Sequence, residues 1–394
     1  MGIVVVGGGL AGTTVCRELR RRHYRDEIVL LERETADPYD RPPLSKRFLQ
    51  GRAEPADIGL PHARELSELA VRRLPGTTVA GLTGDAVVCD DGRALPFNGL
   101  VIATGSTARR LPGQPDVRGV HRLRTLADAL ALRRELAEAR SMVVVGGGFI
   151  GLEVAASAVA LGVDVTVVER AALPLAHAIG PVAAAWLTDL HRSHGVRFAC
   201  ESDVAGFDIA DHGVRGVELV GGERLRADVV LVGVGAEPET RWLAGSSVPL
   251  ADGVVCDAAL RAAPRIYSAG DVARWDHPIF GSIRAEHWTT AVDHARTVAA
   301  NLSAELAGGE EGDFREAAEI PYFWTEQYDV KLQLAGWVAG HDRVEVIENG
   351  KRRAILYGRG DVVVAAAGLN HPAFVARQRK AIAAGTRWSD ALES

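Results

Sequence analysis

The sequence has few cysteines and no strong excess of charge of one sign. Its four cysteines, Cys16, Cys89, Cys200 and Cys256, lie far apart and form neither a C-x-x-C motif nor a spacing with histidine that suits zinc. A disulfide framework and a dithiol redox site therefore lack support, and we expect no bound metal. The formal net charge of −6 argues against a nucleic-acid-binding protein, for which a basic surface is typical.

Long apolar runs and an N-terminal targeting signal are also lacking. The longest apolar stretch, 142–162, contains Glu153 and is crowded with glycine at its start, as is typical of a buried strand and helix rather than a membrane span. Residues 1–6 have no basic segment of a signal peptide, and Val6 stands where myristoylation favours Ser or Thr. We therefore expect a cytoplasmic protein that does not bind membranes.

Glycine, in contrast, is abundant, with 43 among 394 residues against a usual share of about 7%. One cluster, Gly7–Gly12, matches G-x-G-x-x-G between a β-branched run at 3–6 and a helical stretch. A second apolar strand at 27–31 follows and ends at Glu32, 20 residues beyond the last glycine of the motif. This order predicts a Rossmann-like βαβ unit that binds a dinucleotide, with Glu32 on a ribose.

The same pattern recurs at Gly146–Gly151, between a strand at 141–145 and a helical stretch, and the next strand ends at Glu169. In such a motif the first glycine allows a tight turn, the second lets the backbone approach a pyrophosphate, and the third lets the helix pack on the strand. Two units predict two dinucleotides, a flavin held permanently and a nicotinamide that exchanges. Glu169 favours NAD over NADP because it repels a 2′-phosphate, whereas the adjacent Arg170 weakens that preference.

Further segments are typical of one known family: Pro38–Lys46, Ala103–Ser106, Leu123–Thr125, Gly148–Glu153, Val232–Pro238, Ala269–Val272 and Phe323–Asp329. Together with the two glycine motifs, these segments resemble the FAD-dependent NADH–ferredoxin reductases that serve bacterial oxygenases and cytochromes P450.

The resemblance implies an α/β fold of the glutathione-reductase type, with two Rossmann-like dinucleotide-binding domains and a small α+β C-terminal domain. It implies an FAD-binding domain at 1–106 and 236–315, an NAD-binding domain at 107–235 and the C-terminal domain at 316–394. The implied activity passes electrons from NADH through FAD to a separate [2Fe–2S] ferredoxin that supplies a P450 or Rieske oxygenase, in a monomer or homodimer. Alternatives are an NADH oxidase, a quinone or rubredoxin reductase, and a redox-sensing interaction protein similar to apoptosis-inducing factor.

The motifs and the resemblance together predict the site residues. For FAD these are Gly7, Gly9, Leu10, Ala11, Gly12, Glu32, Arg33, Arg41, Lys46, Val79, Ala103, Thr104, Gly105, Arg124, Gly270, Asp271 and Trp288. For NAD they are Gly146, Gly148, Phe149, Ile150, Gly151, Glu153, Glu169 and Gly235. The resemblance gives catalytic roles to Lys46, Glu153 and Trp288. It implies that Lys46 and Glu153 form an ion pair beside the flavin, where a cation stabilises the reduced anionic ring and the carboxylate lowers the cost of burying it.

Several polar and aromatic residues have two interpretations. We expect His177, His191 and His194 to lie on the surface, and His287 to be a hydrogen-bonded neighbour of the flavin site. The late aromatics are either C-terminal core or face an incoming iron–sulfur protein: Phe323, Trp324, Trp337 and Trp388. Basic residues either steer an acidic ferredoxin or are simply solvated: Arg343, Arg352, Arg353, Arg377, Arg379 and Lys380. Pro42–Ser45 lacks the redox cysteine of disulfide-reducing relatives, which argues against disulfide substrates.

Overall fold

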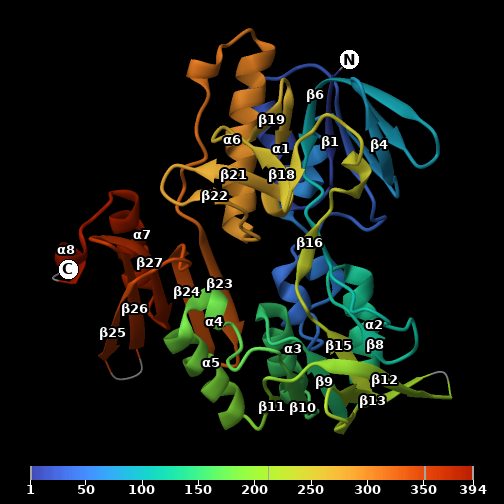
Figure 1. The fold of residues 1–394 in the computed structure, drawn as a ribbon. Helices are drawn as coiled ribbons and strands as arrows, with labels where there is room; N and C mark the ends of the chain where they lie inside the picture. Colours follow the sequence, from blue (N-terminus) through green and yellow to red (C-terminus); the bar gives the residue numbers. More distant parts are fainter. Residues whose placement is uncertain (1, 212, 350–351, 393–394) are drawn as a thin grey trace. The chain divides into compact units, whose positions relative to one another are not determined.

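The computed structural model describes residues 2–211, 213–349 and 352–392 (Figure 1). The chain forms two compact units, each assembled from separate segments. The first contains Met1–Asp40, Gly59–Thr107 and Glu237–Pro321, and the second contains Arg41–Ile58, Ala108–Ala236 and Tyr322–Ser394. The chain crosses from one unit to the other within the short strands β7 (Ser106–Ala108) and β16 (Ala236–Pro238).

The first unit is built on a sheet in which β1 (Gly2–Val6) lies between β2 (Ile28–Glu32) and β6 (Ala94–Ile102), all parallel. The sheet continues through β20 (Ile266–Ser268) and β3 (Val71–Pro75), giving the order β19-β20-β6-β1-β2-β3. Every residue of β1 and β2 is buried, so their unbroken apolar runs reflect a sheet that is covered on both faces. The other strands of this unit are β4 (Val79–Thr83), β5 (Ala86–Cys89), β17 (Leu250–Ala251), β18 (Gly253–Cys256), β19 (Arg261–Ala263), β21 (Ala273–His277) and β22 (Gly281–Ile283).

Two helices pack together in the first unit, α1 (Leu10–Arg21) and α6 (Trp288–Leu306). In Figure 1 they stand beside the strands of the first unit. Helix α1 begins at Leu10, because the second half of the glycine motif forms its first turn. The glycines therefore belong to the helix N-terminus itself.

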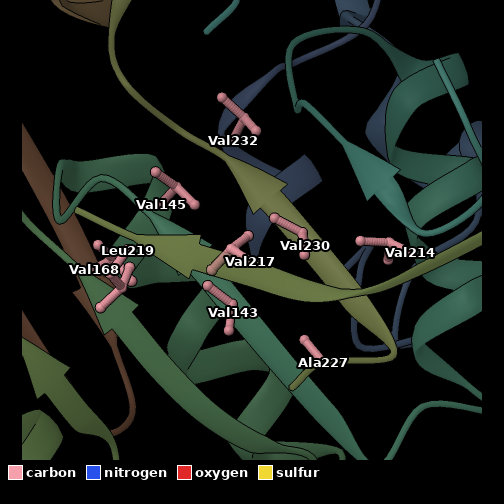
Figure 2. Close-up of a cluster of buried hydrophobic side chains, with 9 residues drawn as sticks. All are labelled: Val143, Val145, Val168, Val214, Val217, Leu219, Ala227, Val230 and Val232. Carbon is pink, nitrogen blue, oxygen red and sulfur yellow. The ribbon is translucent and has the colours of Figure 1, made fainter. Parts of the chain in front are cut away.

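The second unit repeats the parallel arrangement with the strand order β11-β10-β9-β15-β8. Its strands are β8 (Val120–His121), β9 (Ser141–Val145), β10 (Asp164–Val168), β11 (Arg197–Ala199), β12 (Val204–Ala210), β13 (Gly213–Leu219), β14 (Arg224–Arg226) and β15 (Val229–Val232). Its helices before the C-terminal sheet are α2 (Leu126–Leu136), α3 (Phe149–Ala160), α4 (Ala176–Ile179) and α5 (Pro181–Ser193). Figure 2 shows valines of β9 and β15 packed with Val217 and Leu219 of β13, which joins the parallel sheet to the β12-β13-β14 sheet in one core.

The C-terminal part of the second unit is an antiparallel sheet in the order β23-β24-β27-β26-β25. Its strands are β23 (Tyr322–Gln327), β24 (Val330–Gly336), β25 (Arg343–Asn349), β26 (Arg352–Arg359) and β27 (Val362–Leu369). Helix α7 (Pro372–Ala383) packs on β24 and β27, and α8 (Trp388–Leu392) follows. The predicted fold class, two Rossmann-like units and a small α+β part, is confirmed, whereas the predicted domain boundaries stay a prediction.

Candidate functional site

The first glycine loop, Gly7–Gly12, joins β1 to α1 in the first unit. Gly7 has a φ of +114°, and a Cβ there would collide with the Ala103 carbonyl oxygen. A Cβ at Gly12 would collide with the carbonyl oxygen of Gly7. These two glycines are therefore required by the packing of the protein itself.

The middle glycine, Gly9, is different. A Cβ at Gly9 would meet no atom within 4 Å, and its φ of −76° is open to any residue. The second glycine loop, Gly146–Gly151, repeats this arrangement, because Cβ atoms at Gly146 and Gly151 would collide with backbone oxygens while Gly148 has only one neighbour, at 3.9 Å. Protein packing does not require the middle glycines, whereas the close approach of a pyrophosphate does.

Both loops also leave helix N-terminal amides available. Gly9 and Gly148 are the N-cap residues of α1 and α3, and neither helix has a side-chain cap among the residues that the structure describes. Helix α2, in the same chain, is closed by a reciprocal capping box between Thr125 and Asp128. The amides of α1 and α3 are therefore left to an anion, for which a helix N-terminus is a natural site.

The carboxyl ends of the other parallel strands gather around the first loop. Ala103 follows β6, and its amide donates to the Val6 carbonyl oxygen at 2.8 Å. Gly270 follows β20 with a φ of +77°, and a Cβ there would lie 3.1 Å from Cβ of Ala11. The next residue, Asp271, accepts a hydrogen bond from the Ser106 hydroxyl at 3.3 Å. Ligands of such sheets bind at this edge, so the first unit brings these predicted FAD residues to one place.

Glu32, at the end of β2, lies against the first loop, and a Cβ at Gly8 would collide with its side chain. Both of its carboxylate oxygens accept hydrogen bonds from Arg73, at 2.9 and 3.2 Å. Burial raises the pKa of Glu32, and the Arg73 guanidinium opposes that shift. Arg73, which sequence reasoning missed, thus offsets part of the cost of burying the carboxyl group of Glu32, a residue that is 3% exposed. Nearby, the predicted FAD residue Arg33 pairs with Glu239 at 3.2 Å.

Glu169 takes the corresponding place in the second unit. Its carboxylate accepts from the amides of Gly147 and Ala171, both at 2.8 Å. The neighbouring Arg170 is exposed. Gly235, beyond β15, has a φ of +99° and open space at its Cβ position. The Glu169 carboxylate is therefore fixed at the mouth of the second glycine loop, where a ribose hydroxyl would lie.

Lys46 and Glu153 meet in the second unit, with Lys46 Nζ 2.7 Å from Glu153 Oε2. Their side chains are 18% and 8% exposed, so the pair is largely removed from water. Lys46 follows the 3₁₀ turn Pro42–Ser45, and Glu153 lies in the first turns of α3. The two residues thus form a largely buried ion pair rather than two separate surface charges.

Two hydroxyls that sequence reasoning did not single out complete the environment of Glu153. Ser45 Oγ donates to Oε2 at 2.5 Å and Thr325 Oγ1 donates to Oε1 at 2.7 Å. Thr325 belongs to β23, where alternate residues 323, 325 and 327 share one face. This period of two is the local feature of the sequence that indicates which side chains of the strand share a face with Thr325. The Glu153 carboxylate therefore has donors on both oxygens, as a buried charge requires.

The remaining predicted residues lie in two places. In the second unit, Arg41 donates to the carbonyl oxygen of Arg124, and Phe149 packs edge-to-face on Phe323 with ring centroids 4.8 Å apart. Ile150, beside Phe149, is 40% exposed. In the first unit, Trp288 is 37% exposed and its indole N–H donates to Asp40 at 2.8 Å.

Four other predicted FAD residues of the first unit, Thr104, Gly105, Leu10 and Val79, lie in loops or at the start of a helix or strand. Thr104 donates its hydroxyl to the Glu239 carbonyl oxygen at 2.7 Å. Gly105 has a φ of +68°. Leu10 opens α1 and Val79 opens β4, and both are half-buried. The contact of each of these residues with FAD stays a prediction.

One histidine prediction is wrong. His191 is completely buried, whereas His177 and His194 are exposed as expected. Burial lowers the pKa of His191 to about 4, so the ring is neutral at pH 7. His191 lies on the apolar stripe of α5 with Ala184, Leu187 and Thr188, and this helical spacing was the signal that the sequence offered.

The late aromatics and basic residues divide between core and surface. Phe323, Trp324, Trp337 and Trp388 are all half-buried. Arg353 stacks over Trp186 and Arg379 over Tyr322, with centroid distances of 5.5 Å. Arg343, Arg352, Arg377 and Lys380 are exposed. Burial lowers the pKa of His287 to about 4, so a neutral ring precedes Trp288.

The described part of the chain has no candidate metal cluster and no membrane-spanning helix, and its cysteines are unpaired. No group of three His, Cys, Asp or Glu residues there is arranged to hold a metal ion. All four cysteines are free thiols. Within 2–211, 213–349 and 352–392, no helix is both long and apolar enough to cross a membrane.

Comparison with known proteins places the chain in a family of flavin-dependent reductases. The family model described as pyridine nucleotide-disulphide oxidoreductase matches residues 1–295, and the one described as reductase C-terminal matches residues 322–392. The ferredoxin–NAD(+) reductase component of the anthranilate 1,2-dioxygenase system of Burkholderia cepacia is 37% identical over 396 residues, covering 97% of this chain and 94% of the relative. Putidaredoxin reductase of Pseudomonas putida is 33% identical over 382 residues, covering 94% and 89%.

A solved structure supports the same conclusion. The covalent putidaredoxin reductase–putidaredoxin complex matches with a TM-score of 0.91 and 32% identity, covering 98% of this chain and 93% of that one. The two glycine loops, whose middle glycines face open space, fit the two dinucleotides of such enzymes. The chain therefore belongs to the pyridine nucleotide-disulphide oxidoreductase family and is an oxidoreductase that uses FAD and NAD(H).

Proposed function

We propose that the protein is an NADH–ferredoxin reductase, which passes electrons from NADH through FAD to a separate [2Fe–2S] ferredoxin that supplies a P450 or Rieske oxygenase. The observation that carries this proposal is the pair of glycine loops, each with a middle glycine that packing does not require. Two dinucleotide sites in one chain suit an electron relay between two cofactors. Relatives named as reductase components of oxygenase systems support this choice of acceptor.

We assign FAD to the first glycine loop, together with Glu32, Ala103–Gly105 and Gly270–Asp271. NADH is assigned to the second loop, together with Glu169 and Gly235. The corresponding proposed domains are 1–106 and 236–315 for FAD, 107–235 for NAD, and 316–394 for the C-terminal domain. When bound, FAD supplies the ability to accept two electrons from NADH and to release them one at a time.

The residues of the chain contribute binding, orientation and charge. The amides at the N-termini of α1 and α3 bind the pyrophosphates, and Glu32 and Glu169 orient the riboses. The Lys46 ammonium would offset negative charge on a bound flavin, and Glu153 holds that ammonium at 2.7 Å and lowers the cost of burying it. Trp288, whose indole N–H donates to Asp40, would contact the bound flavin.

The acceptor is tested with the purified, FAD-loaded protein. NADH is mixed with a plant-type or adrenodoxin-like [2Fe–2S] ferredoxin, a rubredoxin, a quinone or oxygen alone, and the loss of NADH absorbance is followed with the spectrum of each carrier. We expect reduction of the [2Fe–2S] ferredoxin to exceed the other rates by at least about tenfold. Fast NADH oxidation by oxygen or quinone without ferredoxin reduction would overturn the proposal, and a long-lived reduced protein that reduces no carrier would indicate a redox-sensing role instead.

We also propose a cytoplasmic location. All four cysteines are free thiols, as is usual in a reducing compartment. Fractionation of the source cells, with activity and immunoblot measured in each fraction, tests this location.

A further inference from the structure

A row of buried polar side chains connects Glu153 of α3 with α5 in the second unit, through the β23–β24 hairpin. Figure 1 labels these helices and strands. We name the five residues Glu153, Thr325, Gln327, His191 and Tyr328 the relay. Thr325 Oγ1 lies 2.7 Å from Glu153 Oε1, and Gln327 Nε2 lies 3.1 Å from Thr325 Oγ1. His191 Nε2 lies 2.7 Å from Gln327 Oε1, and the Tyr328 hydroxyl lies 3.0 Å from His191 Nδ1. The relay thus extends from the ion pair to the turn of the hairpin.

The relay is closed to water over most of its length. Thr325 and Gln327 are each 1% exposed, His191 is 0% exposed and Glu153 is 7% exposed. Because water cannot replace a missing partner there, every donor in this row needs an acceptor in the protein. If one hydrogen bond reverses its direction, the adjacent hydrogen bonds must therefore reverse theirs as well.

The direction of each hydrogen bond follows from Glu153. An ionised carboxylate only accepts, so Thr325 must give it its single proton. Thr325 then accepts from Gln327 Nε2, which turns the amide oxygen toward His191. His191 must donate from Nε2, so its Nδ1 is unprotonated and accepts from the Tyr328 hydroxyl. All four donors point toward Glu153, and the neutral ring agrees with the lowering of the His191 pKa by burial.

We propose that Thr325, Gln327 and His191 are positioning residues for the Lys46–Glu153 ion pair. They hold the Glu153 carboxylate from the side opposite Lys46, and the charge of Glu153 in turn sets the direction of every hydrogen bond in the relay. The importance of the relay for electron transfer rests on the proposed function. Its directional coupling does not, and can be measured in the protein with or without NADH.

A network that merely fills the core has no such coupling, and the variant Glu153→Gln separates the two cases. Lys46 Nζ only donates, so the new amide oxygen stays on the side of Lys46 and the amide N–H₂ turns toward Thr325. Thr325 then accepts from it and donates to Gln327, whose amide flips. His191 next accepts at Nε2 and donates from Nδ1. The variant therefore moves the His191 proton from one ring nitrogen to the other.

The proton is located by long-range ¹H–¹⁵N NMR of protein labelled with ¹⁵N-histidine, with His191→Gln used to assign the ring signals. We expect Nε2–H in the wild-type protein and Nδ1–H in Glu153→Gln. The control Thr188→Val changes a buried threonine of α5 outside the relay, whose hydroxyl donates to Ala184 O, and should leave Nε2–H in place. Two results would overturn the proposed direction of the hydrogen bonds in the relay. One is an Nδ1–H tautomer in the wild-type protein, and the other is an unchanged tautomer in Glu153→Gln.

The positioning role is tested at Thr325. Thr325→Val keeps the shape of the side chain and removes the hydroxyl, and should slow flavin reduction by NADH about tenfold in stopped flow with little change in NADH affinity. Thr325→Ser should restore the rate, and Thr188→Val should not alter it. A reversed tautomer in Glu153→Gln with an unchanged rate in Thr325→Val would overturn the positioning role of the relay and leave the proposed function standing. An unchanged tautomer with a slowed rate would overturn only the directional relay.

Discussion

His191 should make the second unit sensitive to acid. Its ring is buried and both nitrogens are engaged, with Gln327 at 2.7 Å and Tyr328 at 3.0 Å. A second proton on the ring would have to displace the proton that Tyr328 donates, and it would place an uncompensated charge in the core. Burial accordingly lowers the pKa of His191 to about 4, while an unfolded histidine titrates near 6.5.

The sign of the effect follows from which state binds the proton first. Above about pH 6.5 His191 is neutral in both the folded and the unfolded chain, so its contribution is constant. As the pH falls below 6.5 the unfolded chain takes up the proton and gains free energy that the folded chain does not. Between pH 7 and pH 5 this lowers the free energy of unfolding by about 2 kcal/mol, and the loss levels off at about 3 kcal/mol below pH 4.

The measurement is urea unfolding of the FAD-loaded protein at pH 7 and pH 5, followed by circular dichroism. His191→Gln keeps a donor and an acceptor but does not titrate, so its loss of stability between the two pH values should be about 2 kcal/mol smaller than that of the wild-type protein. The exposed His177, changed to Gln, is the matched control and should reproduce the wild-type difference. An equal loss in His191→Gln and in the wild-type protein would refute the reasoning, whatever the absolute stability of the variant at pH 7.

Three further predictions concern the cofactors. Gly9→Ala should leave the thermal unfolding temperature of the cofactor-free protein nearly unchanged but lower the amount of FAD retained after desalting. Gly12→Ala should lower the unfolding temperature itself, because its Cβ would collide with the backbone. Equal unfolding temperatures in the two variants would contradict the different roles of these glycines. Glu169→Ala should raise the KM for NADH about tenfold and narrow the preference for NADH over NADPH in steady-state assays; an unchanged NADH/NADPH ratio would show that this acid does not read the ribose. Lys46→Ala should keep the fold, because Ser45 and Thr325 still donate to Glu153. It should slow flavin reduction by about 10- to 100-fold in stopped flow, and Lys46→Arg should recover part of the rate. An unaltered rate in Lys46→Ala would show that Lys46 has no role in flavin reduction.

Much of the dinucleotide-binding architecture could be predicted because it depends on local geometry. The turns at Gly7 and Gly146 need positive φ, and the helices after them pack so closely on these turns that only glycine fits at 12 and 151. Both requirements fall within six residues of one chain segment. Strand, turn and helix therefore appear in the sequence in the same order as in the fold.

The surroundings of the ion pair could not be predicted in this way. Thr325 and Glu153 are 172 residues apart, and His191 and Gln327 are 136 residues apart, so no local period places them together. His191 looked like a surface residue because its neighbours in sequence are polar, although α5 buries it on an apolar stripe. Arg73 likewise finds Glu32 only because β2 and β3 pair in parallel.

The sequence by itself determined that the chain has two dinucleotide-binding units, since the glycines of each loop and the acid at the end of the next strand are recognised from their spacing along a short segment. Only the tertiary structure decided which polar side chains would share the interior with Glu153. A buried charge must have donors on every side, and which residues provide them depends on how distant elements pack together. The hydrogen bonds around Glu153 are therefore a property of the folded second unit, in which α3, α5 and β23 meet.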